Sequence, residues 1–144
     1  RGFPFRSIDM SLIEWSPRLS LGIDEIDHQH RKLIELINDL DRAMEQGQGK
    51  AVIGRILDGL VAYTQFHFSA EEKLMDRCSY PGSERHKGEH VAFVRKLIDF
   101  KTGYAAGQLG LSIAVMSFLS TWLTEHIPGT DRQYVPHMTS ACSR

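Results

Sequence analysis

The strongest constraint on the fold is a repeated spacing of apolar residues along four segments of the chain. In each segment, inward-facing residues recur alternately every three and four positions, which places them on one face of an α-helix. In the first segment these positions are Ile23, Ile26, His30, Leu33, Ile37, Leu40 and Met44. No segment shows the period-two alternation of a β-strand. The spacing therefore predicts an all-α protein.

Glycine and proline separate the segments, which we expect at about 24–46, 50–77, 83–106 and 111–127. The breaks contain Gly47 and Gly49, then Pro81-Gly82, Gly107 and Gly110, and finally Pro128-Gly129, which we expect to stop the fourth helix. Four amphipathic helices joined by short turns predict an antiparallel up-down-up-down four-helix bundle. Residues 11–21 before it are expected to form an ordered but non-helical N-terminal arm.

The length of 144 residues favours one domain with a real hydrophobic core. We assign that domain to residues 10–137. Residues 1–9 have no periodicity and precede Met10, so we interpret them as a remnant of cloning or as a linker from an upstream domain. Residues 138–144 are interpreted as a C-terminal tail.

Composition and charge argue against several classes of partner. The formal net charge of −1 does not suggest nucleic acid or an anionic membrane. No apolar run approaches the roughly 18 residues that span a bilayer, and no secretory signal is recognisable. Cys78 and Cys142 are too few and too far apart for a disulfide framework or a thiolate metal site. We therefore expect a reducing, cytoplasmic setting.

Ionisable residues occupy inward-facing positions in every segment, and an aspartate follows the last one. These residues are His30, His67, Glu71, His86, His90, His126 and Asp131. Burying them unpaired would cost at least about 2 kcal/mol each. In an antiparallel bundle, the start of the first and third helices and the end of the second and fourth share one end. At about 1.5 Å rise per residue, all seven side chains can converge there.

The local spacing and the donor types suit a metal centre. His67 and Glu71 are four residues apart, as are His86 and His90, so each pair shares a helical face. Five imidazoles and two carboxylates are too many ligands for one tetrahedral zinc. Two adjacent six-coordinate ions bridged by the carboxylates would use them, and this donor set suits iron, with manganese or zinc as weaker possibilities.

Four motifs in order carry a resemblance to a known family. The sequence reads IDHQH at 26–30, HFSAE at 67–71, HKGEH at 86–90 and WLTEHIPGTD at 122–131. In this order they resemble the hemerythrins, over about residues 12–134. The other two histidines, His28 and His137, lie off the inward face or past the bundle, and we expect surface roles for them.

The resemblance implies a division of the ligands between two iron ions. One iron, coordinatively full, would be held by three histidines: His86, His90 and His126. The second iron, which keeps an open position for dioxygen, would be held by His30 and His67. Glu71 and Asp131 would bridge the two irons together with a solvent-derived oxo or hydroxo group.

The implied function is reversible dioxygen binding, for oxygen carriage, storage or sensing, without catalysis. Leu33, Phe68 and Leu123 lie within one turn of the ligands, and we predict that they line the dioxygen pocket and slow the entry of water. A di-iron redox enzyme, acting as a peroxidase or on nitric oxide, is an alternative. Ferritin-like oxygenases use two Glu-x-x-His motifs on paired helices, and the sequence lacks that pair.

A third reading is the input domain of a larger signalling protein. It predicts the same metal site, so the sequence leaves it open beside a free-standing carrier. The partner would then be a downstream signalling domain, whereas a carrier would serve an oxygen-using enzyme. The sequence does not indicate an oligomeric state.

Overall fold

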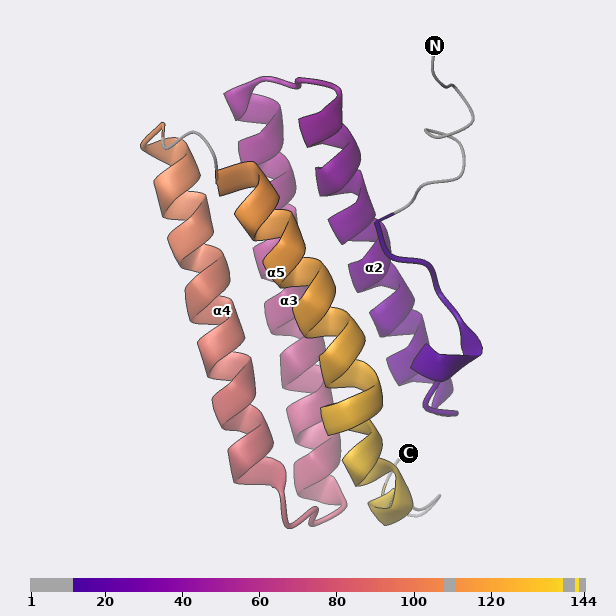
Figure 1. Cartoon of the computed structure of the whole chain (residues 1–144). Coiled ribbons are helices and arrows are strands. Elements are labelled where there is room, and N and C mark those ends of the chain that lie inside the picture. Colours follow the sequence, from indigo (N-terminus) through magenta and orange to yellow (C-terminus); the bar gives the residue numbers. More distant parts are fainter. Residues whose placement is uncertain (1–11, 108–110, 139–141, 143–144) are drawn as a thin grey trace.

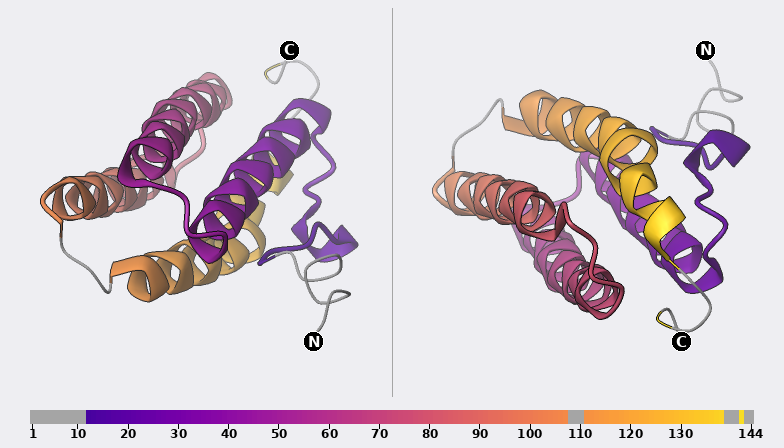
Figure 2. Two further views of the ribbon diagram at one scale, coloured as in Figure 1. Left: turned by 90° about the horizontal axis from the view of Figure 1, so that it is seen from above. Right: turned by 90° about the horizontal axis from the view of Figure 1, so that it is seen from below.

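The structure is a computed structural model, and it describes residues 12–107, 111–138 and 142. These residues form four long helices and no strand: α2 (Asp24–Glu45), α3 (Lys50–Arg77), α4 (Ser83–Ala105) and α5 (Leu111–Glu125). Each helix runs antiparallel to the next in the chain, and α5 closes the bundle by packing against α2 (Figure 1). The views along the bundle in Figure 2 place the four helices around one shared core. The predicted four-helix bundle is confirmed.

The helix ends lie close to the predicted positions for clear local reasons. Gly47 and Gly107 follow α2 and α4 with φ of +67° and +84°, a backbone region that glycine adopts without steric cost. Ser83 is the first residue of α4 and follows Gly82, which holds the N-cap position. The Ser83 hydroxyl donates to the Asp76 carboxylate at 3.0 Å and so ties the start of α4 to the end of α3.

The apolar core fills the bundle between its two ends. Leu40, Leu97 and Leu119 come from three different helices and are fully buried. Burying such a side chain contributes about 1.5–3 kcal/mol relative to leaving it exposed. This packing fixes the depth at which the polar residues of each helix face the interior.

The sequence predicted that the fourth helix stops at Pro128-Gly129, but the chain stays helical through these residues. It continues as a π-helical turn, η2 (His126–Thr130), and then as a 3-10 segment, η3 (Asp131–His137). Ile127 and Tyr134 are fully buried along this continuation. Their burial holds the chain against the end of the bundle, which overrides the usual effect of proline and glycine.

The N-terminal arm lies along the outside of α2 and is non-helical apart from the short 3-10 turn η1 (Pro17–Leu19). Asn38 of α2 binds both backbone polar groups of Ile13, because its side-chain oxygen accepts from the Ile13 N–H at 3.0 Å and its amide donates to the Ile13 carbonyl at 2.9 Å. The carboxylate of Asp27 accepts from the Leu21 N–H at 2.8 Å. Arg132 donates to the carbonyl of Arg18 at 2.7 Å, so the arm also contacts the end of the bundle.

The expectation about the cysteines was wrong. Cys78, directly after α3, forms a disulfide with Cys142, and their Cα atoms lie 5.2 Å apart despite a sequence separation of 64. The fold brings them together because η3 turns the chain back toward the end of α3, where Arg77 donates to the Cys142 carbonyl at 3.1 Å. The cysteines therefore give no support to a reducing, cytoplasmic setting, which stays a prediction.

Two further predictions concern the ends of the chain and the membrane. The predicted boundary before residue 10 and most of the predicted tail at 138–144 lie outside the described residues. Among the helices that are described, none combines the length and the hydropathy needed to cross a bilayer.

Candidate metal centre

All seven predicted ligand side chains meet at one end of the bundle, which is drawn at the bottom of Figure 1. α2 begins there, α3 ends, α4 begins, and α5 passes into η2 and η3. Each of the seven side chains is at most 5% exposed: His30, His67, Glu71, His86, His90, His126 and Asp131. The structure thus brings these side chains together, as predicted from the position of each residue along its helix.

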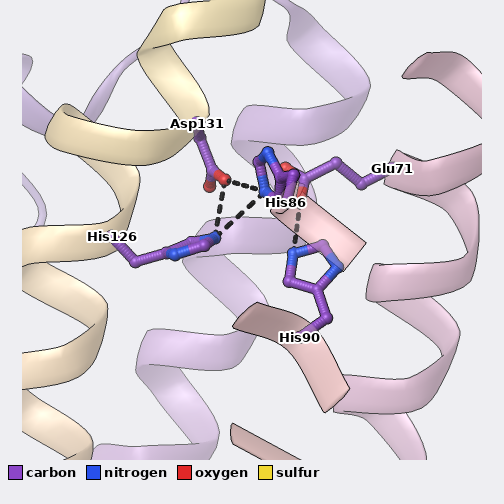
Figure 3. A group of neighbouring side chains, drawn as sticks. All are labelled: Glu71, His86, His90, His126 and Asp131. Carbon is purple, nitrogen blue, oxygen red and sulfur yellow. Dashed lines mark hydrogen bonds and ion pairs between the residues drawn. The ribbon is translucent and has the colours of Figure 1, made fainter. Parts of the chain in front are cut away.

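The seven side chains form two groups that share one carboxylate. Within each group, the potential ligand atoms lie within 4.8 Å of one another. The first group comprises Glu71, His86, His90, His126 and Asp131, five side chains that point toward one another in Figure 3. The second group comprises His30, His67 and Glu71. This grouping has the three-plus-two division of histidines that the resemblance implied.

Asp131 lies at the centre of three histidines. Its oxygens are 2.8 Å from Nε2 of His126, 2.9 Å from Nε2 of His86 and 3.1 Å from Nε2 of His30. His30 belongs to the second group, so this carboxylate reaches histidines of both groups. It therefore stands where a bridging ligand would stand.

Glu71 occupies the corresponding position from α3. One oxygen is 3.0 Å from Nε2 of His90 and 3.4 Å from Nε2 of His86. The other oxygen is 3.8 Å from the Nε2 atoms of both His30 and His67. Each oxygen thus faces a different pair of histidines, an arrangement suited to a carboxylate shared between two metal ions.

The π-helical turn is what brings His126 and Asp131 to the same site. These residues are five apart, and in a regular α-helix of 3.6 residues per turn they would point in clearly different directions. A π turn pairs residues five apart, and here the N–H of Asp131 donates to the carbonyl of His126. Both side chains consequently face the bundle interior, and π turns of this kind recur at functional sites.

The hydrogen bonding of the cluster tests whether a metal fits. Several buried atoms that face the cluster make close ion-pair contacts but no hydrogen bond of normal geometry among the described residues: Nε2 of His30 and His90, Oε1 of Glu71, and both carboxylate oxygens of Asp131. Buried polar groups are normally paired, and each unpaired one costs about 1–3 kcal/mol. Lone pairs of imidazole and carboxylate are what a divalent or trivalent cation would use. The buried cluster therefore fits metal binding.

The pKa values of the histidines reflect two opposing effects. Burial lowers the pKa of His67 to about 4, since its nearest carboxylate is too distant to compensate. Burial also acts to lower the pKa of His86, but the carboxylates of Asp131 and Glu71 outweigh it and raise that pKa to about 9. For His30 the same competition with Asp131 leaves the pKa raised.

The carboxylates keep their negative charge inside the core. Burial acts to raise the pKa of Asp131, but contacts with three histidines hold it well below its usual value. For Glu71, burial and the charge of Asp131 act to raise the pKa, and the histidines around it more than offset both. Without metal, the site thus holds protons on some histidines in order to neutralise two buried anions, and a cation would take the place of those protons.

Comparison with known proteins agrees with this geometry. Residues 21–138 match the family model described as the hemerythrin HHE cation binding domain. The chain belongs to the hemerythrin family. A bacteriohemerythrin of Stenotrophomonas maltophilia is 38% identical over 125 residues, which are 87% of this chain and 80% of that protein. A bacteriohemerythrin of Pseudomonas aeruginosa is 36% identical over 126 residues, 88% of this chain and 81% of that protein.

A solved structure gives the same result for the fold. The crystal structure of a wild-type hemerythrin superposes with a TM-score of 0.83 at 28% sequence identity, and the match covers 90% of this chain and 99% of that one. A hemerythrin domain implies a di-iron site, and the buried histidine and carboxylate cluster is compatible with one.

Three of the histidines in this hemerythrin domain lie against aromatic rings. The His90 ring stacks on Phe68 with centroids 3.6 Å apart, and His126 stacks on Trp122 at 4.0 Å. His86 lies nearly parallel to Tyr134 at 5.8 Å. These contacts restrict rotation of the imidazoles. Phe68 was predicted to line a dioxygen pocket, and that role stays a prediction, as it does for Leu33 and Leu123, which are buried in the core.

Tyr134 has a polar role in this hemerythrin domain that the sequence did not reveal. Its fully buried hydroxyl donates to Oε2 of Glu71 at 2.7 Å. Burial and the neighbouring Glu71 charge raise the pKa of Tyr134 well above its usual value, so the hydroxyl stays protonated. No motif pointed to it, because a single tyrosine after a helix is most often a packing residue.

A second set of polar residues contacts the outer ring nitrogens of the histidines. Nδ1 of His90 is 2.8 Å from Oε2 of Glu72, and Nδ1 of His67 is 2.7 Å from the amide oxygen of Gln29. Sequence reasoning missed both residues. The only signal was their position next to or within the motifs. His28 and His137 are exposed and outside the cluster, in line with the surface roles expected of them.

Proposed function

We propose that this chain binds dioxygen reversibly at a non-haem di-iron centre, as an oxygen carrier, store or sensor. The observation that supports this proposal is the sharing of Glu71 between two groups of buried histidines, with Asp131 reaching into both. The three-histidine group would hold one iron, and the two-histidine group the other. The pair of irons, when bound, would supply the two electrons that reversible dioxygen binding requires.

The unequal number of histidines favours binding at one metal. His86, His90 and His126, with both carboxylates and one solvent-derived bridge, would supply six donors to the first iron. His30 and His67 would supply one donor fewer to the second, so that ion would keep a position for an external ligand. Dioxygen would then bind on the side of the cluster that faces α2 and α3.

The chain itself would orient the ligands and exclude water. Leu33, Phe68 and Leu123 are each at most 5% exposed, and we propose that they wall the dioxygen pocket. Tyr134 holds Glu71 through its hydroxyl. An enclosed apolar wall slows the entry of water and anions that promote irreversible oxidation.

The test is an iron count combined with an optical titration. Metal-free protein is loaded anaerobically with ferrous iron, and we expect two irons per chain. Dioxygen should then produce a visible absorption band that disappears under argon and returns over repeated cycles. A single iron, or a steady consumption of dioxygen with turnover of added peroxide, would refute the proposal, and the second result would favour a redox enzyme.

Variants at the ligands make the iron count specific. Glu71→Ala and His126→Ala should each lose metal, since either change removes a donor and leaves other buried ligands uncompensated. Glu71→Gln keeps the shape of the side chain and serves where the alanine variant does not fold. His28→Ala is the matched control, because His28 is exposed and outside the cluster. Full iron occupancy in the Glu71 and His126 variants would contradict the ligand assignment.

A further inference from the structure

The contacts of the outer nitrogens differ between the two groups of histidines. The Nε2 atoms face the cluster, so a metal-bound histidine would carry its proton on Nδ1 and donate it outward. In the three-histidine group, Nδ1 of His90 meets the carboxylate of Glu72 at 2.8 Å. In the two-histidine group, Nδ1 of His67 meets the neutral amide oxygen of Gln29 at 2.7 Å.

The remaining histidines extend this difference. Nδ1 of His126 lies 3.3 Å from a carboxylate oxygen of Glu89, an ion-pair contact without the alignment of a hydrogen bond. Thr130 donates to the same oxygen at 3.2 Å and holds it in place. Nδ1 of His30 is buried and has no hydrogen-bond partner among the residues that the structure describes. Nδ1 of His86 is likewise buried without a hydrogen-bond partner. Among the described residues, carboxylate partners therefore occur at two histidines of the first group and at neither histidine of the second.

A carboxylate and an amide act differently on a metal through the imidazole. A carboxylate that accepts the Nδ1 proton pulls it away from the ring and makes Nε2 a stronger electron donor. A stronger donor stabilises the ferric ion more than the ferrous ion, because the ferric ion has the larger charge. An amide oxygen has no net charge and produces a smaller effect of the same kind.

We propose that Glu72 is a positioning residue that makes the three-histidine iron the more easily oxidised of the pair, while the neutral Gln29 keeps the dioxygen-binding iron ferrous. This inference rests on the proposed di-iron site. Glu89 contributes in the same direction from the His126 side. Two features of the fold keep this pattern fixed: Gln29 is buried and donates to Glu25 at 3.3 Å, and Glu72 lies in the groove between α3 and α4, beside His90.

The groove explains why a charge costs less beside His90 than it would beside His67. It has a volume of about 450 Å³ and is lined by Glu72, His90 and the exposed side chain of Val91, among others. The Glu72 side chain is 28% exposed, so its carboxylate keeps part of its hydration. Gln29 is 3% exposed, and an unpaired carboxylate there would carry a large desolvation cost.

The test compares one-electron oxidation of four proteins loaded with two ferrous irons. A one-electron oxidant such as ferricyanide takes an electron from one ferrous ion, which becomes ferric, and is itself reduced to ferrocyanide. The two oxidation steps are followed by absorption and by paramagnetic resonance of the singly oxidised state. Glu72→Gln keeps the shape but removes the charge, and Gln29→Glu adds a charge beside His67. Glu84→Gln is the matched control, since this glutamate of α4 is 90% exposed.

We expect Glu72→Gln to raise the potential of the first step and Gln29→Glu to lower that of the second. A tenfold change in the ferric-to-ferrous ratio corresponds to about 59 mV. Glu84→Gln should leave both potentials in place. Iron release to a chelator provides a second readout, and Glu72→Ala should release one iron about 10- to 100-fold faster.

Three results would overturn the inference. Equal shifts of the first potential in Glu72→Gln and Glu84→Gln would mean that only the overall charge of the protein matters. A rise of the second potential in Gln29→Glu, in place of the expected fall, would contradict the asymmetry between the two groups. If the metal analysis finds fewer than two irons per chain, both the proposed function and this inference are refuted. A protein with two irons and the expected shifts, but without reversible dioxygen binding, would support this inference and refute the proposed function.

Discussion

Replacing Tyr134 with phenylalanine isolates a single buried hydrogen bond. The ring would remain stacked near His86, and only the hydroxyl that donates to Glu71 at 2.7 Å would be lost. This distance is typical of a strong bond from a hydroxyl to a carboxylate. Tyr134 and Glu71 are both fully buried, so water does not replace the lost donor.

The expected loss of stability follows from these values. A hydrogen bond to a charged group contributes about 1.5–3 kcal/mol, and we expect Tyr134→Phe to lower the free energy of unfolding by that amount. At roughly 2–4 °C per kcal/mol for a chain of this size, the melting temperature should fall by about 3–12 °C.

The assay is urea unfolding of the metal-free protein with its disulfide intact, followed by circular dichroism. An unchanged dependence on urea concentration, with a lower midpoint, would attribute the effect to stability. Tyr104→Phe is the control, since it removes a hydroxyl from a half-buried ring at the other end of the bundle. A loss below about 0.5 kcal/mol in Tyr134→Phe would refute the reasoning, because it would mean that Glu71 does not depend on this donor.

Three further predictions concern pH, the arm and the pocket. In metal-free protein, the urea midpoint should be highest near pH 6.5, the pKa of an unfolded histidine. Below pH 6.5 the unfolded chain takes up a proton that folded His67, with a pKa of about 4, does not, so stability falls. Above pH 6.5 the stabilisation from protonated His86, with a pKa of about 9 in the fold, is lost as pH rises through 9. A monotonic profile between pH 4 and 9 would contradict this. Asn38→Ala should cost about 1–3 kcal/mol and speed hydrogen exchange at the Ile13 amide, and unchanged exchange there would show that the arm is held by other contacts. Leu123→Ala should speed autoxidation of the iron-loaded protein by admitting water, and an unchanged decay of the dioxygen-dependent band would reject its place in the pocket wall.

The helices and the ligand cluster were predictable because both follow from periodicity. The three-four spacing of apolar residues fixes which face of each helix is buried, and the same phase places Glu71 inward and Glu72 toward the surface. The antiparallel order of the helices then fixes the depth of each ligand. Together, these two regularities were enough to bring residues from four segments to one level.

The end of the fourth helix was less predictable because tertiary packing overrides local preference there. Pro128 and Gly129 are strong helix breakers, and the sequence alone gave no reason to expect a π turn. The deciding contribution comes from the burial of Ile127 and Tyr134, which depends on contacts with other helices.

The sequence also did not predict the residues that contact the metal ligands without being ligands themselves. Gln29 and Glu72 resemble ordinary polar residues of a helix surface, and their roles depend on which imidazole lies opposite them. The disulfide between Cys78 and Cys142 is a similar case, since it depends on the path of the chain after the bundle.

The π turn also limits how this chain can change in length. Removing one residue between His126 and Asp131 would leave the aspartate four residues after the histidine, a spacing that puts both side chains on one face of an ordinary α-helix. Adding one residue while the π turn is kept would instead swing the aspartate by about 100° around the axis and take away the oxygen atoms that lie between the two sets of imidazoles. Four residues between His126 and Asp131 are therefore the longest stretch that one π turn accommodates, whatever their identities.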